Sequence, residues 1–176
     1  MKIVVINGFP GAGKDEFVNC CKKLIGEPYV GNISTVDFVK YIATECGWDG
    51  TKTPENRAFL SDLKDLLTEW NDIPFKKIEK ALSIYETEWL TYGVLEKGII
   101  FIHCREPKEI QKLCTRLGAI AIFINRKEAK EKSQSNHADA EVENFRYDYY
   151  INNNGTINDL MKEAEKFLIN LKILKK

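Results

Sequence analysis

Ile3-Val4-Val5-Ile6-Asn7-Gly8-Phe9-Pro10-Gly11-Ala12-Gly13-Lys14-Asp15 combines an apolar run with a glycine-rich turn near the start of the chain. The run from Ile3 to Ile6 is β-branched throughout, which is typical of a strand buried on both faces of a parallel sheet. Residues 8–14 then match G-x-x-x-x-G-K, a pattern that binds phosphate groups when it lies between a strand and a helix. Apolar residues recur every three or four positions from Lys14 to about Ile25, so a helix is expected there.

The residue types of this turn suit a chain of phosphate groups. Glycines let backbone N–H groups approach phosphate oxygens closely, and the following helix N-terminus adds unpaired donors and a partial positive charge. Lys14 is placed to reach the β- and γ-phosphates as a point charge. The turn therefore predicts ATP binding, with Lys14 also in a catalytic role. The candidate ATP-binding residues of this segment are Gly8, Pro10, Gly11, Ala12, Gly13, Lys14, Asp15 and Glu16.

Asp15 occupies the position where this motif usually carries Ser or Thr, whose hydroxyl contacts Mg²⁺. A carboxylate is a stronger ligand for magnesium, although it adds negative charge beside the phosphates. An acidic residue is also favoured at a helix N-terminus without any metal. Both interpretations, a Mg²⁺ ligand and a helix-capping acid, stay open at this point.

Strands and helices alternate through most of the chain, which predicts an α/β fold in three layers, with a parallel sheet covered by helices on both faces. The helical segment at about 37–92 interrupts this alternation, and we interpret it as an insertion. Its helix beginning at Pro54 is expected to turn Phe59, Leu66 and Trp70 inward. The other expected elements are strands at 29–36, 99–104, 119–124 and 149–151, and helices at 107–117 and after Thr156.

Arg105 follows the strand expected at 99–104 and therefore lies where ligands bind to parallel sheets, beyond the carboxyl ends of the strands. An arginine there is suited to hold the phosphate of an acceptor through two hydrogen bonds. A surface ion pair with Glu106 or Glu109 is the alternative. His103 stands at the strand tip, where many phosphate-loop proteins carry a Mg²⁺-linked Asp, and we interpret it as a hydrogen-bonded packing residue.

The segment from Lys127 to Asn136 is polar and lacks apolar periodicity. We interpret it as a basic arm that closes over ATP, excludes water and stabilises the transferring charge. Arg126 is its best candidate for contact with ATP and for catalysis, because it directly follows a core strand. A solvated charged helix, supported by ion pairs at helical spacing, is the alternative.

Composition limits the classes of partner. The 26 Lys and Arg residues balance 26 Asp and Glu residues, which argues against nucleic acid or an anionic membrane as partners. The five cysteines form no C-x-x-C pair, and no apolar stretch reaches about 18 residues, so a cytoplasmic protein without a membrane span is expected. Four charged residues of the insertion are candidates to hold the acceptor or to be solvated: Asp37, Lys40, Arg57 and Lys64.

Three features together resemble the nucleoside monophosphate kinases, and more narrowly the group of phage-type deoxynucleoside monophosphate kinases and animal-type phosphomevalonate kinase. They are Gly13-Lys14-Asp15, the arginine of His103-Cys104-Arg105, and a late pattern that runs from Asn144-Phe145 through Asp148 and Ile151 to Gly155. The resemblance implies a five-stranded parallel core, a helical acceptor-binding insert and a short lid. The corresponding ranges are a core at 1–36, 93–125 and 147–176, the insert at about 37–92 and the lid at about 126–146.

The resemblance also implies an adenine site near Asn153 to Thr156, so Asn153 and Gly155 join the candidate ATP-binding residues. It favours transfer of the γ-phosphate of ATP, with Mg²⁺, to a small acceptor, most simply a nucleoside or deoxynucleoside monophosphate. The lid departs from the pattern, because related kinases carry two or more arginines there and this chain has Arg126 followed by lysines. Two alternatives stay open: a nucleotide-binding module without kinase activity, and a kinase of a non-nucleotide phosphate.

Overall fold

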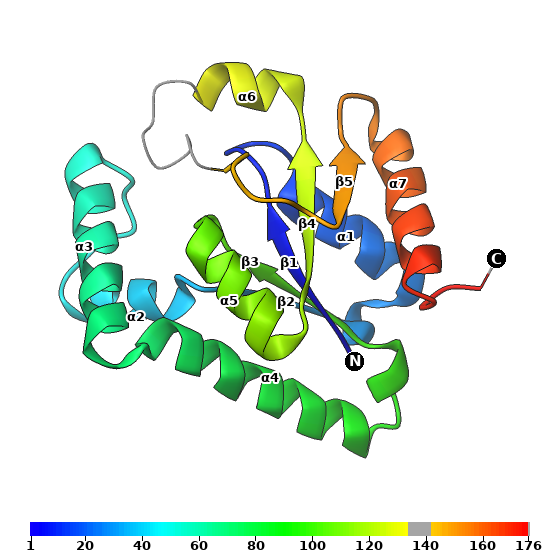
Figure 1. Ribbon diagram of the computed structural model, residues 1–176, viewed down its shortest axis with the longest axis horizontal. Helices are drawn as coiled ribbons and strands as arrows, with labels where there is room; N and C mark the ends of the chain where they lie inside the picture. The colour runs from blue at the N-terminus through cyan, green and yellow to red at the C-terminus, as the bar shows by residue number, and fades with distance from the viewer. Residues whose placement is uncertain (134–141, 176) are drawn as a thin grey trace. The chain divides into compact units, whose positions relative to one another are not determined.

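A computed structural model describes residues 1–133 and 142–175 of the chain (Figure 1). The residues form a five-stranded sheet in the order β2-β3-β1-β4-β5. β1 pairs in parallel with β3 and with β4, and β4 pairs in parallel with β5. The expected α/β class with a five-stranded parallel sheet is thus confirmed. The strands are β1 (Lys2–Asn7), β2 (Val30–Ser34), β3 (Ile99–His103), β4 (Ile120–Asn125) and β5 (Tyr149–Asn152).

The glycine-rich turn joins the central strand β1 to helix α1 (Lys14–Ile25). Lys2 to Ile6 align with Ile99 to His103 of β3, and Val4 to Asn7 align with Ile120 to Phe123 of β4. Because all three strands run in the same direction, the turn, Arg105 and Arg126 all follow the carboxyl ends of neighbouring strands. This is the edge at which α/β proteins bind ligands.

Helices cover both faces of the sheet (Figure 1). On one face α1 packs against α7 (Ile157–Asn170), and Phe17 of α1 meets Phe101 and Phe167 at ring-centroid distances of 6.1 and 5.7 Å. On the other face α5 (Pro107–Leu117) packs against β1 and β4. Val4, Val5 and Ile6 are fully buried, as a strand covered on both faces requires.

The chain divides into two compact units, one of residues 1–32 and 89–176 and the other of residues 33–88. The second unit contains α2 (Asp37–Glu45) and α3 (Pro54–Asn71), which pack against each other. It also contains most of α4 (Ile73–Thr91). Thr53 caps the N-terminus of α3, since its side chain accepts a hydrogen bond from the Asn56 N–H. The short elements η1 (Glu27–Tyr29), η2 (Leu95–Lys97) and α6 (Lys127–Ser133) complete the fold.

The inward face expected for α3 is wrong for all three residues named for it. Phe59, Leu66 and Trp70 are 40%, 63% and 80% exposed, although their spacing is typical of a buried helical face. In the adjacent α4, Trp89 is buried, whereas its neighbour Leu90 is exposed. Spacing identifies the apolar face of a helix, but only tertiary contacts decide whether that face is covered.

No helix in the described parts of the chain combines the length and the apolar character needed to cross a bilayer.

Candidate functional site

The glycine-rich turn folds into a loop that needs glycine at its two ends. Gly8 has φ +150°, and a Cβ there would lie 2.7 Å from the carbonyl oxygen of Ile124. Gly13 has φ +92° and caps the N-terminus of α1 with its backbone, so it occupies a left-handed conformation that side chains disfavour. The loop therefore combines a close approach to β4 with an open helix N-terminus, which suits a phosphate group.

The ammonium group of Lys14 turns back over this loop. Its Nζ donates hydrogen bonds to the carbonyl oxygens of Gly8 and Phe9, at 2.7 and 3.1 Å. These contacts hold the positive charge against the main chain of the loop. Lys14 therefore lies where the sequence places it, at the first residue of α1 and against the loop that it is expected to serve.

The segment between β5 and α7 is fastened to the loop and to the arm. Asn153 Nδ2 donates to the carbonyl oxygen of Ala12 at 2.8 Å, and a Cβ at Gly13 would overlap the same amide nitrogen. Asn154 Oδ1 accepts a hydrogen bond from the Lys127 N–H at 2.7 Å. Three segments expected to contact ATP, the loop, the start of the arm and 153–155, thus meet at one edge of the sheet.

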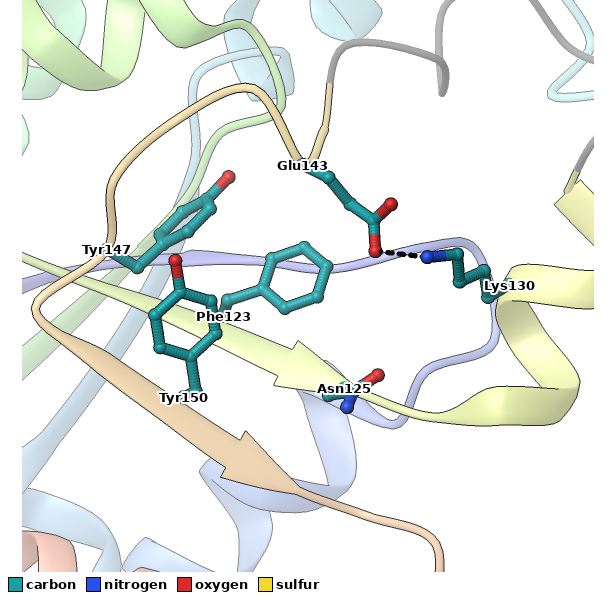
Figure 2. A pocket seen from close by; sticks show the side chains of 6 residues that line it. All are labelled: Phe123, Asn125, Lys130, Glu143, Tyr147 and Tyr150. Atoms are coloured by element: carbon teal, nitrogen blue, oxygen red, sulfur yellow. Dashed lines mark hydrogen bonds and ion pairs between the residues drawn. The ribbon is translucent and has the colours of Figure 1, made fainter.

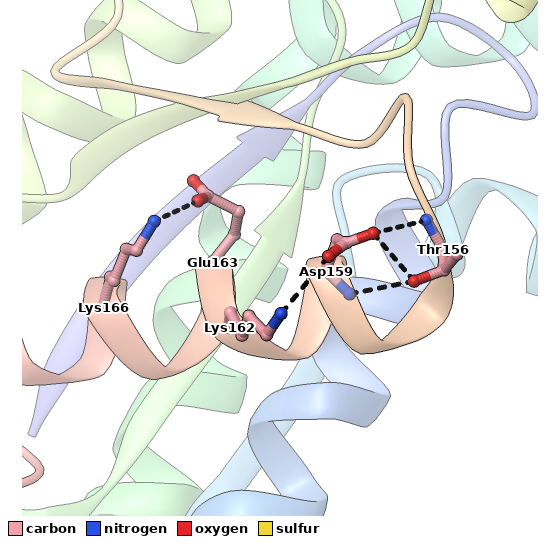
Figure 3. A network of polar contacts seen from close by, with 5 residues as sticks. All are labelled: Thr156, Asp159, Lys162, Glu163 and Lys166. Carbon is pink, nitrogen blue, oxygen red and sulfur yellow. Dashed lines mark hydrogen bonds and ion pairs between the residues drawn. The ribbon is translucent and has the colours of Figure 1, made fainter.

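Thr156 and Asp159 fix the start of α7 beside this edge (Figure 3). The Thr156 side chain accepts from the Asp159 N–H, and the Asp159 carboxylate accepts from the Thr156 N–H at 3.0 Å, a reciprocal capping box. These hydrogen bonds, first that from the Thr156 backbone, hold the pKa of the Asp159 carboxyl below its ordinary value. Gly155 lies against the same carboxylate, since a Cβ there would come within 2.7 Å of Asp159 Oδ2.

Asp15 presents an exposed carboxylate at the first turn of α1. Its side chain is 83% exposed, and Oδ1 lies 3.6 Å from His103 Nε2. His103 Nε2 also lies 2.8 Å from Asn32 Oδ1, so the ring is held by a hydrogen bond, as expected. The exposure of Asp15 leaves its oxygens accessible to a metal ion. No group of three or more His, Cys, Asp or Glu in residues 1–133 and 142–175 is arranged to hold a metal by itself.

Sequence reasoning missed a buried polar network beneath the loop. Asn7 Oδ1 accepts from the Gly8 N–H at 2.8 Å, and Asn7 Nδ2 donates to the Tyr147 hydroxyl at 2.7 Å and to the Arg105 carbonyl oxygen at 3.2 Å. Tyr147 in turn donates to the Val142 carbonyl oxygen. A polar residue ending an apolar strand was the only signal in the sequence for Asn7, and none pointed to Tyr147.

Arg105 and Arg126 both lie at the expected ends of strands and are exposed or partly exposed. The Arg105 main chain is anchored by Asn7, as described above. Arg126 Nη2 forms an ion pair with Glu128 Oε2 at 3.1 Å, within the start of the arm. Residues 127–133 of the arm form α6, and its expected continuation through 134–141 lies outside the described residues.

The four acceptor candidates of the insertion all belong to the unit of residues 33–88. Asp37 Oδ2 accepts from the Ser34 N–H at 2.7 Å and thus supports the start of α2. Lys40 and Arg57 are exposed, whereas Lys64 is 6% exposed and is the one buried residue of α3. Their role with an acceptor stays a prediction.

No family model and no curated protein matches the sequence. Solved structures of similar shape include a dephospho-CoA kinase from Campylobacter jejuni, with a TM-score of 0.48, 15% identity, and coverage of 99% of this chain and 98% of that chain. An APS kinase from Mycobacterium tuberculosis has a TM-score of 0.45, 13% identity, and coverage of 97% and 96%. A thymidylate kinase from Ehrlichia chaffeensis has a TM-score of 0.42 and 12% identity, with coverage of 95% of this chain and 98% of that chain.

The class of this protein follows from its own features. A parallel sheet with a central β1, a G-x-x-x-x-G-K loop after that strand and a helix beginning at Lys14 together define an α/β fold of the phosphate-loop class.

Proposed function

We propose that this protein is an ATP-dependent phosphotransferase that moves the γ-phosphate of ATP to a small phosphorylated acceptor. The first candidates for this acceptor are the nucleoside and deoxynucleoside monophosphates. The observation that carries the proposal is the loop of residues 8–14 in its strand–loop–helix setting, with the Lys14 ammonium held over it. Backbone N–H groups and Lys14 would bind the β- and γ-phosphates, and 153–155 would lie beside the adenine.

In the proposed reaction, an oxygen of the acceptor phosphate bonds to the γ-phosphorus while the bond from that phosphorus to the bridging oxygen of ADP breaks. The acceptor oxygen is already ionised, so no side chain has to remove a proton. The protein's part is therefore to position both molecules and to balance their charge. Lys14 serves the donor, Arg105 the acceptor phosphate, and Arg126 the charge on the transferring group.

The residues present fit a Mg²⁺ ion in this role. Sites for phosphoryl transfer hold Mg²⁺ through one or two carboxylates together with substrate phosphates, and Asp15 offers one exposed carboxylate beside the loop. When bound, Mg²⁺ would neutralise charge on the phosphate oxygens. Asp15 would hold the ion, and His103 would limit the orientations open to the Asp15 carboxylate.

Two observations support an acceptor that carries a phosphate group. Arg105 stands at the carboxyl end of β3, two strand positions from β4 across the loop-bearing β1. The unit of residues 33–88 supplies further charged side chains, among them Lys40 and Arg57, which are exposed. Arg105 would bind the phosphate of a non-nucleotide acceptor in the same way. The acceptor is therefore identified by the activity assay.

One observation favours a second candidate function, a nucleotide-binding module without transfer. Arg126 is paired with Glu128, and lysines replace further arginines in the arm. Lysine lacks the planar group that grips phosphate oxygens in pairs. Such a module would bind ATP and release no ADP with any acceptor.

The test is a coupled assay of ADP release with Mg-ATP and a panel of all common nucleoside and deoxynucleoside monophosphates. The proposal expects turnover with at least one acceptor. ATP binding without turnover across the panel would favour the binding module or a non-nucleotide acceptor. Absence of ATP binding would contradict both functions.

A further inference from the structure

A pocket of about 340 Å³ is lined by six residues, none of them named above as a candidate to contact ATP or acceptor, although Lys130 belongs to the arm (Figure 2). Phe123 and Asn125 come from β4, Tyr150 from β5 and Lys130 from α6, while Glu143 and Tyr147 come from the segment before β5. All six belong to the unit that carries the loop. The volume is near the lower end of the range of small-molecule sites.

Three aromatic rings form one side of the pocket. The Phe123 ring lies 5.1 Å from the Tyr147 ring and 6.1 Å from the Tyr150 ring, and Tyr147 lies 5.8 Å from Tyr150 at 82°. Tyr147 is buried, whereas Tyr150 is 62% exposed. Tyr150 therefore keeps an accessible ring face at the mouth of the pocket, which a planar ligand can cover.

The polar side chains of the pocket differ in their hydrogen-bond partners. Lys130 Nζ donates to Glu143 Oε1 at 2.8 Å, an ion pair on the rim. Within residues 1–133 and 142–175, the Asn125 side-chain amide and the Tyr150 hydroxyl make no hydrogen bond. The Asn125 amide presents both a donor and an acceptor, so the pocket pairs an aromatic surface with a two-way hydrogen-bonding group.

We propose that this pocket binds a nucleobase, with the ring stacked on Tyr150 and its polar edge on the Asn125 amide. Planar heteroaromatic bases stack on tyrosine and phenylalanine, and a side-chain amide matches an adjacent donor and acceptor on a base edge. A purely apolar ring would leave the amide without a partner. The ion pair of Lys130 and Glu143 closes the rim with further donors and acceptors.

The pocket is linked to the phosphate loop by two contacts. Phe9, the second residue of the loop, meets Phe123 edge-on at 6.0 Å between ring centroids. Tyr147 joins the pocket to Asn7, whose side chain accepts from the Gly8 N–H. Burial raises the pKa of Tyr147, so its phenol stays neutral and keeps both hydrogen bonds. A base in the pocket would thus restrict the segment that holds the loop in place.

The base has two possible sources, the acceptor itself or a separate nucleoside ligand, and the chemistry of recognition is the same. Binding of the acceptor's base rests on the proposed phosphotransfer, whereas binding of a separate nucleoside does not. The test therefore measures binding before activity. Adenosine, guanosine, cytidine and thymidine are added to the full chain with saturating Mg-ADP, so that the donor site is filled, and binding is followed by NMR.

At least one nucleoside should bind and shift the side-chain amide signals of Asn125. Tyr150→Ala should weaken that binding at least about fivefold, the lower limit for a lost stacking partner. Asn125→Ala should weaken it about two- to tenfold, the scale of one lost hydrogen bond. Tyr92→Ala, which removes a ring that is 77% exposed on another part of the surface, should leave it unchanged. Because Tyr150 and Asn125 are exposed, the variants should keep the folded spectrum of the parent.

Failure of all four nucleosides to bind at about 10 mM, a concentration far above ordinary ligand affinities, would overturn the proposal. Equal binding of benzyl alcohol, or binding unaffected by both variants, would overturn it as well.

If an acceptor is known from turnover, a raised KM with unchanged kcat in Tyr150→Ala assigns the base to the acceptor. An unchanged KM with lost nucleoside binding assigns it to a separate ligand. Lack of turnover in the parent would bear on the proposed function alone.

Discussion

The side-chain amide of Asn153 donates a hydrogen bond to the main-chain carbonyl oxygen of Ala12 at 2.8 Å, although 141 positions separate the two residues in the chain. The same amide fills the space beside Gly13, where a Cβ would overlap it. Asn153 therefore acts as a positioning residue that holds the end of the phosphate loop against the β5–α7 segment. This link connects the two parts of the chain that are expected to hold the phosphates and the adenine.

Asn153→Ala should weaken ATP binding about three- to tenfold, because one partly buried hydrogen bond contributes about 0.5–1.5 kcal/mol and the loop becomes freer without it. Titration calorimetry with a non-hydrolysable ATP analogue measures the change. Asn158→Ala, at an exposed position of α7, is the matched control and should bind like the parent. Equal affinities for the Asn153 variant and the parent would show that the link does not position the loop.

Asp15→Asn should raise the Mg²⁺ concentration needed for half-maximal ADP release, because an amide is a much weaker ligand than a carboxylate. Asparagine keeps the size of the side chain and remains tolerated near a helix start, so the fold should be unaffected. The exposed neighbour Asn19 of α1 offers a control, as Asn19→Asp changes charge on the same helix away from the loop. An unchanged Mg²⁺ requirement in Asp15→Asn would assign Asp15 to helix capping alone.

Asp159→Asn should make stability less dependent on pH in the acid range. The folded-state pKa of Asp159 lies below its unfolded value, so the carboxylate contributes stability above about pH 4, the ordinary carboxyl range, and loses it as pH falls through the folded pKa. Urea unfolding of parent and variant at pH 7 and near pH 3 measures this. The gap between the two proteins should be larger at pH 7, and a gap that grows toward acid pH would contradict the capping geometry.

Cys46 should react with iodoacetamide far faster than the other four thiols of the folded protein. Cys46 is exposed, whereas Cys20, Cys21 and Cys104 are buried and Cys114 is partly buried. Burial raises the pKa of Cys20, Cys21 and Cys114, so less reactive thiolate is present at a given pH. Mass spectrometry after brief labelling at pH 8 should find one modified site, and Cys46→Ser should abolish it. Rapid labelling at Cys21 would contradict the packing of α1.

Local signals predicted the core elements closely. α1 begins at Lys14 and ends at Ile25, α5 spans Pro107–Leu117 and Thr156 caps α7, all as the caps and periodicities indicate. These features depend on residues within a few positions of each other, which a single sequence displays. Strand ends moved by one or two residues, since pairing with neighbours sets them.

Contacts between distant segments could not be predicted in the same way. Nothing in the sequence pairs Asn7 with Tyr147 or Asn153 with Ala12, because each pair is formed only when the sheet brings its strand ends together. The exposure of Trp70 has the same origin, as helical spacing does not tell which neighbour covers a face. The pocket beside Phe123 combines four segments and left no local signal at all.

The most direct test of phosphotransfer compares the parent with Lys14→Ala and with Lys23→Ala in the ADP-release assay with Mg-ATP and the full panel of monophosphates. Lys23 is an exposed lysine in the last turn of the same helix, so its variant changes the same charge away from the loop. We predict turnover with at least one acceptor in the parent and in Lys23→Ala, and a loss of at least about 100-fold in Lys14→Ala, the scale for removing a group that stabilises transition-state charge. Equal turnover in all three proteins, or no turnover in the parent with any acceptor, would contradict the account.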